Sequence, residues 1–460
     1  MKKIVLSMAG VLAATAFAPE ASAIPAFARQ TGLACSSCHY QHYPVLSTTG
    51  QEFKVGAYTQ LSAKGKFKGD DLSIPDTLNA AILLKARYQK SSGVDPAGTV
   101  GGQTTNSGQF QIPDELSLFF GGRIGDNGTV KMGFMNENNM VGGPAGGIIA
   151  GLKTPIAIAM DPVTIQVIPY GTDALGMAYG FEQSSTGMTR GIRWAENRSD
   201  ISAAQYTGIG SGTASGVAFV VSNDMGYINL SKWSPQFFYV AGTTGTRMTS
   251  TWLRVAATPT IADWAMHIGV GMASGTSACG GVTPADPAVP TAYVAGTNCE
   301  TKGTVLDFQA QGAVAEMETS VYVQYANAPA SKVPAAGLTN LFNSKDATAK
   351  KAITIGADFS VIPHTLHVGA AYRIANTGLS GADQTAGRGD KDNSLTVTAV
   401  YDLFQNVALH INHSMRSGSS YDTNGTNRAA TNPAGSVSAT SLAVNSLGKN
   451  LTTFMLEAAW

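Results

Sequence analysis

Five consecutive residues near the amino end of the chain have the types and spacing of a haem attachment site. Cys35 and Cys38 are separated by two residues, and His39 follows the second cysteine directly. Two thiols at this spacing can add to the two vinyl groups of haem, and the adjacent histidine then becomes an axial ligand of the iron. The motif predicts one covalent c-type haem, with Cys35 and Cys38 as attachment residues and His39 as the metal ligand.

Three other uses of a cysteine pair with this spacing fit the sequence less well. A thioredoxin-like redox pair belongs to a βαβ unit, and the sequence around Cys35 shows no such pattern. A zinc site needs two more ligands at suitable spacing, and only His42 lies close by. A plain disulfide is the third alternative. Histidine is scarce, at 7 of 460 residues, so its position directly after Cys38 favours haem.

The start of the chain has the features of a signal peptide. Lys2 and Lys3 form a basic region, a short apolar run follows, and Ala21-Ser22-Ala23 is a small-residue cleavage signal. The apolar run is too short to favour an uncleaved membrane anchor. We therefore expect a mature chain that starts near Ile24 in an oxidising compartment. This agrees with the motif, because haem is attached to c-type cytochromes outside the cytoplasm.

The composition favours strands over helices. Only 13% of residues are charged, whereas soluble domains average about 25%. After the signal peptide no apolar stretch reaches the ~18 residues of a spanning helix. The 30 basic and 30 acidic residues cancel, so we expect no nucleic-acid partner. These observations fit either a soluble all-β protein or a transmembrane barrel.

From about residue 78 onward, segments of roughly ten residues alternate in polarity, as in 319–325, 353–361 and 395–402. Tilted strands that cross a bilayer have about this length, with one face toward lipid. We predict an all-β fold, a transmembrane antiparallel β-barrel of about 16 strands in the bacterial outer membrane, with lipid as a partner. Eighteen strands is the alternative, because turn residues interrupt the pattern between 185 and 245.

The connections between the predicted strands alternate between tight turns and long polar stretches. The expected tight turns are 125–128, 258–260, 362–364 and 404–406. The expected long loops are 89–113, 137–172, 274–302, 327–351, 375–393 and 417–449. Short periplasmic turns and long outer loops are typical of outer-membrane barrels.

The chain is predicted to have three parts: a signal peptide over 1–23, a monohaem cytochrome c segment with its linker over 24–77, and an outer-membrane β-barrel over 78–460. The middle part is too short for a substantial core of its own, so the barrel lumen is the obvious shelter for its haem. Pro44, Leu46 and Phe53, around a short helix over 45–56, could cover the porphyrin. Lys54, Lys64, Lys66 and Lys68 fit either a docking patch for an acidic periplasmic carrier or a solvated linker.

The motif does not fix the second axial ligand of the iron. His42 is three residues from His39, so its ring would struggle to reach the opposite face of the haem. Strand alternation turns His267, His367 and His410 toward the lumen, which makes each a candidate sixth ligand or a plain polar lining residue. A methionine is a further alternative.

Two cysteines and five acids fall in predicted loops. Cys279 and Cys299 share the loop 274–302 and are expected to form a disulfide, with a second metal site as the alternative. The acids could contact extracellular iron, although solvated loop charge explains them equally well: Asp286, Glu300, Asp383, Asp390 and Asp422.

The block from Ile24 to Tyr58 resembles the start of the fused outer-membrane monohaem cytochrome–porins of iron-oxidising bacteria. The resemblance lies in the whole of 24–39 and in these later residues: Tyr43, Pro44, Leu46, Gly50, Phe53, Lys54 and Tyr58. The run 114–124 is also similar to that family, and the rest matches by size, pattern and closing strand. The resemblance implies that Cys35 and Cys38 hold the haem and that the barrel encloses it. It supplies no sixth ligand.

The function expected from this resemblance is Fe(II) oxidation by an outer-membrane cytochrome c. Electrons would pass from extracellular Fe(II) through the haem to a periplasmic carrier, such as a soluble cytochrome c. One alternative keeps the architecture and reverses the current, so that electrons leave the cell for a metal or mineral. Another is a diffusion porin with a structural haem. The sequence does not fix the direction, because it depends on redox potentials.

Overall fold

A computed structural model of the chain describes residues 25–39, 46–62, 66–68, 73–75, 79–93, 106–140, 151–182, 189–236, 247–279, 298–332, 338–344, 348–379, 389–404, 406–422 and 448–460. The predicted signal peptide and the following residues discussed above lie outside this part: Ile24, His42, Tyr43, Pro44, Lys64, Asp286 and Asp383.

The described strands close into an antiparallel barrel with sixteen strand positions, which confirms the predicted fold class and strand number. In barrel order they are β3 (Ala80–Ser91), β4 (Gln109–Asp126), β5 (Val130–Asn139), β6 (Gly151–Lys153) with β7 (Ile156–Met160), β8 (Val163–Thr172), β9 (Ala214–Asn223), β10 (Gly226–Ser234), β11 (Ser250–Ala257) with β12 (Thr260–Ile261), β13 (Trp264–Ser274), β16 (Gly303–Val314), β17 (Met317–Ala328), β19 (Lys350–Ile362), β20 (Leu366–Asn376), β21 (Asn393–Phe404), β22 (Val407–Ser417) and β23 (Asn450–Ala459). Pairing of β23 with β3 closes the ring.

The remaining elements are short. Two small sheets contain β1 (Lys66–Lys68) with β2 (Ser73–Pro75), and β14 (Thr276–Ala278), β15 (Asn298–Glu300) and β18 (Thr339–Asn340). The helices are α2 (Pro25–Thr31), α3 (Cys35–Cys38), α4 (Thr48–Val55), α5 (Trp194–Asn197), α6 (Ala203–Thr207) and α8 (Ser419–Asp422), with 3-10 turns η2 (Met177–Gly180) and η3 (Arg190–Ile192). Helix α4 lies within the range predicted for the short helix. In the described part of the chain, none of these helices is long and apolar enough to cross a membrane.

Two strand positions are each filled by a pair of strands that keep one register. β6 and β7 pair with β5 in register on both sides of Pro155, and β11 and β12 are related in the same way around Pro259. Proline lacks the N–H that a ladder needs, so it interrupts a strand without ending it. The predicted turn at 258–260 and the predicted loop at 137–172 are therefore wrong. The turn after β12 lies at Ala262-Asp263, where both φ angles are positive.

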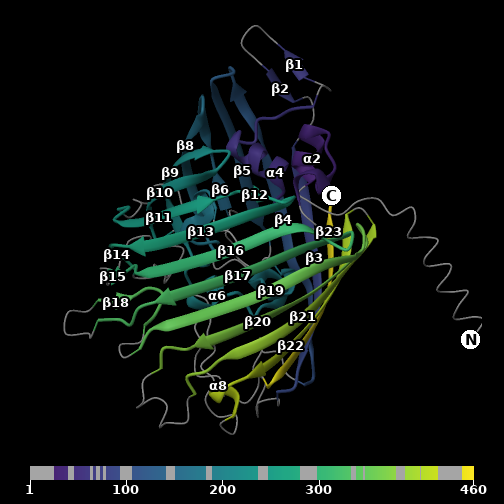
Figure 1. Cartoon of the computed structure of the whole chain (residues 1–460), viewed down its shortest axis with the longest axis vertical. Coiled ribbons are helices and arrows are strands. Elements are labelled where there is room, and N and C mark those ends of the chain that lie inside the picture. The colour runs from purple at the N-terminus through teal and green to yellow at the C-terminus, as the bar shows by residue number, and fades with distance from the viewer. Residues whose placement is uncertain are drawn as a thin grey trace, which may run out of the picture.

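The two faces of the wall differ as the alternation predicted. Ile268, Leu409 and Ile411 point outward and are 48%, 39% and 48% exposed, whereas the inward residues that alternate with them are buried. An apolar outer face with a polar inner face is the arrangement of a strand between lipid and a lumen. The tight turns gather at the end of the barrel that carries the C-terminus (Figure 1), which is the periplasmic end by the usual rule for short turns.

The described residues of the connection between β8 and β9, 173–182 and 189–213, fold into the lumen and do not form barrel strands. We call them the internal segment. Helix α6 packs against β17 and β19, and η3 packs against β20, β21 and β22. The sequence pattern was ambiguous over 185–245 because this segment follows neither a two-residue nor a helical period.

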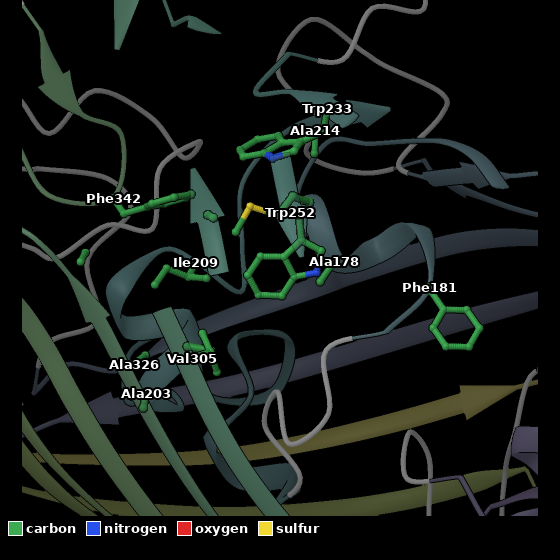
Figure 2. Packing of buried hydrophobic residues seen from close by; sticks show 14 of the residues in the cluster. Ala178, Phe181, Ala203, Ile209, Ala214, Trp233, Trp252, Val305, Ala326 and Phe342 are labelled. Atoms are coloured by element: carbon green, nitrogen blue, oxygen red, sulfur yellow. The ribbon is translucent and has the colours of Figure 1, made fainter. Parts of the chain in front are cut away.

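An apolar core joins the internal segment to the barrel wall. Figure 2 shows Ile209 of the internal segment close to the ring of Trp252 in the interior, with Trp233 and Phe342 nearby. These four residues belong to one buried cluster, and Ile209 and Trp252 are both 0% exposed. The inward residues of most described strands are likewise buried among other parts of the chain.

Candidate functional site

The predicted haem attachment residues lie on one short helix. Cys35 and Cys38 are the first and last residues of α3, so one helical turn brings both side chains to the same side. Cys35 is 7% exposed, Cys38 is half-buried, and the two thiols are not joined as a disulfide. Burial, together with the nearby Cys35 thiol, raises the pKa of Cys38. His39 follows at the end of the helix, where its N–H donates to the carbonyl of Cys35 at 2.9 Å.

Helix α4 packs directly against α3 and fixes the motif. Ser47 caps α4, its hydroxyl donates to the carbonyl of Ser37 at 2.9 Å, and its backbone N–H donates to the carbonyl of Cys38 at 2.9 Å. A Cβ on Gly50 would overlap the carbonyl oxygen of Cys38. Only glycine allows this close approach, which gives a physical reason for the glycine noted in the sequence block.

Three aromatic rings form a small core behind the motif. Phe27 of α2 lies 5.1 Å from the ring of Phe53 and 5.2 Å from that of Tyr58, and Phe53 lies 5.5 Å from Tyr58. Phe27 also fills the space over Gly121 on the inner face of β4, where a Cβ would approach its ring to 2.8 Å. Phe53 is buried in this aromatic core, which ties the segment to the wall.

Residues 25–39 and 46–62, which we call the N-terminal segment, lie inside the barrel near its periplasmic end. Figure 1 shows α2 and α4 at the end that carries the C-terminus. Gln166, on the inner face of β8, donates to the carbonyls of Lys54 and Val55 at 3.2 and 3.0 Å. Gly133 of β5 leaves room for the carbonyl of Ala57, which a Cβ would overlap. The lumen wall thus contains positions shaped to receive this segment.

An ion pair of Lys54 also anchors this segment. Its ammonium pairs with the Glu182 carboxylate of the internal segment and lies 4.4 Å from the centre of the Phe181 ring. The other carboxylate oxygen of Glu182 lies 3.4 Å from Nδ1 of His267 on β13. Burial lowers the pKa of Lys54, and the neighbouring Lys153 and Arg254 lower it further. Lys54 is 7% exposed, so its interpretation as a docking or solvated surface lysine is wrong. The backbone of Lys66 and Lys68 lies in β1.

The three lumenal histidines are buried as the alternation predicted, but they do not gather at one place. His267 lies beside Glu182 and 5.6 Å from the Tyr227 ring. His367 lies 3.4 Å from a carboxylate oxygen of Asp402, and His410 is two strands away on β22. Only His267 has a described contact with the ion pair that anchors the N-terminal segment. Its Nε2 is buried without a hydrogen-bond partner in the described part of the chain.

The residues present fit a c-type haem. The donor set is two thiols on one helical turn, an adjacent histidine and a second buried histidine with an unsatisfied nitrogen. Ligating histidines usually bond a carboxylate or carbonyl through their other ring nitrogen, and a carboxylate oxygen of Glu182 lies 3.4 Å from Nδ1 of His267. Elsewhere, among the residues that the structure describes, no three His, Cys, Asp or Glu side chains gather closely enough to hold a metal ion.

At the opposite end of the barrel, Cys279 and Cys299 form a disulfide with 5.7 Å between their Cα atoms. It joins the chain beside β14 to β15, next to the end of β13. Two of the loop acids already have cationic partners. Glu300 pairs with Lys302 and Lys332 at 3.0 Å each, and Asp390 lies 3.4 Å from Lys391. Asp422 is the last residue of α8. The ion pairs of Glu300 and Asp390 do not indicate an iron site.

Sequence reasoning missed the residues that anchor the N-terminal segment. The role of Gly121, Gly133 and Glu182 depends on contacts across more than 60 residues of chain. The available signals were the position of Lys54 in the resembling block and that of Gly121 in the similar run 114–124. The partner could not be found without the fold.

We expect that Gly50→Val will reduce haem attachment strongly, because the new side chain would force α4 away from Cys38. Haem stain and intact mass of the exported protein measure the fraction attached. Gln51→Val is the matched control, since Gln51 is the next residue and half-buried. Equal haem content in both variants would show that the contact between α3 and α4 is not required.

We expect that Glu182→Leu will loosen the N-terminal segment, because it leaves Lys54 buried without its counter-charge. Removing one partner of a buried pair costs about 3–5 kcal/mol, which should appear as faster hydrogen exchange over α4. The double variant Lys54→Met with Glu182→Leu should restore protection, because it removes both charges. Slow exchange in the single variant would contradict this assignment.

No family model and no curated protein matches the chain. Solved structures similar to it include the outer-membrane channel DcaP of Acinetobacter baumannii, with a TM-score of 0.48 and 12% identity over 86% of this chain and all of that one. A Salmonella typhi OmpF complex has a TM-score of 0.49 and 10% identity over 86% of this chain and 100% of that one. An anion-selective porin from Comamonas acidovorans has a TM-score of 0.46 and 13% identity over 83% and 98%. By its closed wall, apolar exterior and polar interior, the chain is a porin-like outer-membrane β-barrel, as predicted from the sequence.

Proposed function

We propose that this chain carries electrons across the outer membrane through one covalent c-type haem, as members of the fused cytochrome–porin family do. The observation that carries the proposal is the position of the attachment motif inside the barrel. Cys35, Cys38 and His39 belong to a segment anchored inside a barrel in which most described inward side chains are buried. A redox centre held inside the membrane wall is placed to pass electrons from one side of the membrane to the other.

In this proposal the chain's own residues hold and insulate the redox centre. Cys35 and Cys38 form thioether bonds, and His39 is the proximal ligand. Phe27, Phe53 and Tyr58 exclude water from one side of the segment. Bound there, a haem would supply one-electron chemistry, taking an electron from extracellular Fe(II), which becomes Fe(III), and releasing it to a periplasmic carrier.

The inward direction of electron flow rests on the resemblance of residues 24–58 and on the chemistry of iron. Fe(III) formed at neutral pH is insoluble, so its formation outside the membrane protects the periplasm. The apolar layer of the membrane blocks the passage of ions, so a conduit for electrons is needed. Outward transfer to a metal or mineral uses the same residues and differs in the redox potentials.

We further propose His267 as the distal ligand. It is the lumenal histidine next to the anchoring pair, and its Nε2 has no hydrogen-bond partner among the described residues. Glu182 on its Nδ1 would orient the ring and raise its basicity, as carboxylates do beside metal-bound histidines. His367 and His410 lie on another part of the wall, where they serve as polar lining.

The function is tested with protein expressed in a host that attaches haem and purified from its outer membrane. We expect an intact mass that includes one haem, a haem spectrum that becomes reduced on addition of Fe(II), and little ion conductance in planar bilayers. A haem that stays oxidised with Fe(II) but is reduced by a periplasmic donor would support outward transfer. A polypeptide without haem, or a high-conductance channel with a redox-silent haem, would contradict electron transfer.

His267→Ala should convert the haem from six-coordinate to five-coordinate or water-ligated, because the distal nitrogen is lost. Absorption and electron paramagnetic resonance spectra of the ferric protein measure this change. His367→Ala is the matched control, since His367 is also buried and lies beside a carboxylate. Unchanged spectra for His267→Ala would remove His267 as a ligand and would leave the attachment residues unaffected.

A further inference from the structure

Lys153 is a buried cation that lacks a carboxylate partner in the described part of the chain. It lies on β6, with its side chain toward the lumen, and is 8% exposed. The one hydrogen bond of its ammonium is to the carbonyl of Tyr179, at 3.4 Å. Its Nζ lies 4.8 Å from the Tyr179 ring and 5.7 Å from the Tyr58 ring. Two rings and one long hydrogen bond offset only part of the desolvation of an ammonium group.

The neighbouring charges do not supply the missing anion. Lys54 is paired with Glu182, and Arg254 binds Asp307 through two hydrogen bonds of 2.7 and 2.9 Å. Lys153 lies close enough to Lys54 to act on it electrostatically. Of these three cations, Lys153 is therefore the one without a carboxylate at ion-pair distance among the described residues. A buried cation of this kind calls for an anionic ligand.

We propose that Lys153 binds a propionate carboxylate of the haem attached to Cys35 and Cys38. This inference rests on the proposed function and extends it to the opposite edge of the porphyrin. The vinyl groups that react with cysteines and the two propionates occupy different edges of the ring. A c-type haem therefore presents its carboxylates away from its attachment residues.

The fold separates the two positions in the matching way. Gly50, near the start of α4, lies against Cys38, whereas Tyr58, which faces Lys153, follows the end of the helix. From Gly50 to Val55 the helix rises about 7.5 Å, so the cation lies beyond the end of α4 that is farther from the cysteines. The barrel wall thus places the ammonium group of Lys153 beside the segment that would carry the haem, away from the two attachment cysteines.

A small free anion is the alternative ligand that could neutralise the charge of Lys153.

The test uses the haem-loaded protein with Lys153→Met, and Lys153→Gln as a second variant in case methionine impairs folding. Both should keep one haem by intact mass. Loss of the cation leaves the propionate charge uncompensated, which favours ferric haem. At a fixed potential the ratio of ferrous to ferric haem should fall about tenfold, equal to about 59 mV for one electron. The propionate bending bands in the resonance Raman spectrum should shift as well, and Lys153→Arg should restore both properties.

Lys232→Met is the matched control, because this lysine lies on the outer face of β10 and bonds Thr251. It should leave both measurements unchanged. Unchanged Raman bands in Lys153→Met, with haem present, would overturn the proposal, even if the potential shifts through distant charge. A potential that depends on added chloride or phosphate only when Lys153 is present would assign the site to a free anion instead. A protein without haem would overturn the proposed function itself.

Discussion

A charge that is buried inside a filled barrel needs a partner, and this requirement determines how the interior is organised. Lys54 meets it through Glu182, which ties the N-terminal segment to the internal segment, and Glu182 in turn approaches His267 on the wall. Other pairs tie the internal segment to the wall by the same rule. Asp200 accepts from Arg416 of β22 at 2.8 Å. Because removal of one partner strands the other in a medium of low polarity, these contacts fix positions more strictly than apolar packing does.

The backbone of the wall is subject to a similar requirement. An outer wall in lipid must satisfy every backbone group through its strands, and a closed ring of strands does so. The inward side chains are then free to face water or protein. Here the described ones face protein, since the internal segment adds Ile209 to a core with Trp233 and Trp252, and the N-terminal segment adds its aromatic rings. A filled interior of this kind suits a centre that exchanges electrons.

Much of the wall could be predicted from the sequence, because alternation between lipid and interior repeats at every strand. The inward orientation of His267, His367 and His410 followed from this rule alone. The positions of Pro155 and Pro259 misled, because a proline inside a strand gives the same local signal as one in a turn. The internal segment could not be predicted, since it has no period, and its charges pair with residues such as Glu457, more than 200 positions later. The attachment motif could be recognised in the sequence, because its chemistry depends on the spacing of five consecutive residues. Glu182, which anchors the segment that carries the motif, could not be recognised in this way.

The burial of Cys35 has a consequence for the order of biogenesis. In the finished barrel this thiol is 7% exposed, and the segment that carries it is enclosed by β4, β5 and β8. A haem lyase that must act on both thiols reaches them more readily before β23 has joined β3 than afterwards. Under the proposed function, we therefore expect maturation on the periplasmic precursor, before insertion. The barrel would then fold around an N-terminal segment that already carries its haem. If haem attachment failed, the insertion machinery would receive a barrel in which part of the interior is missing.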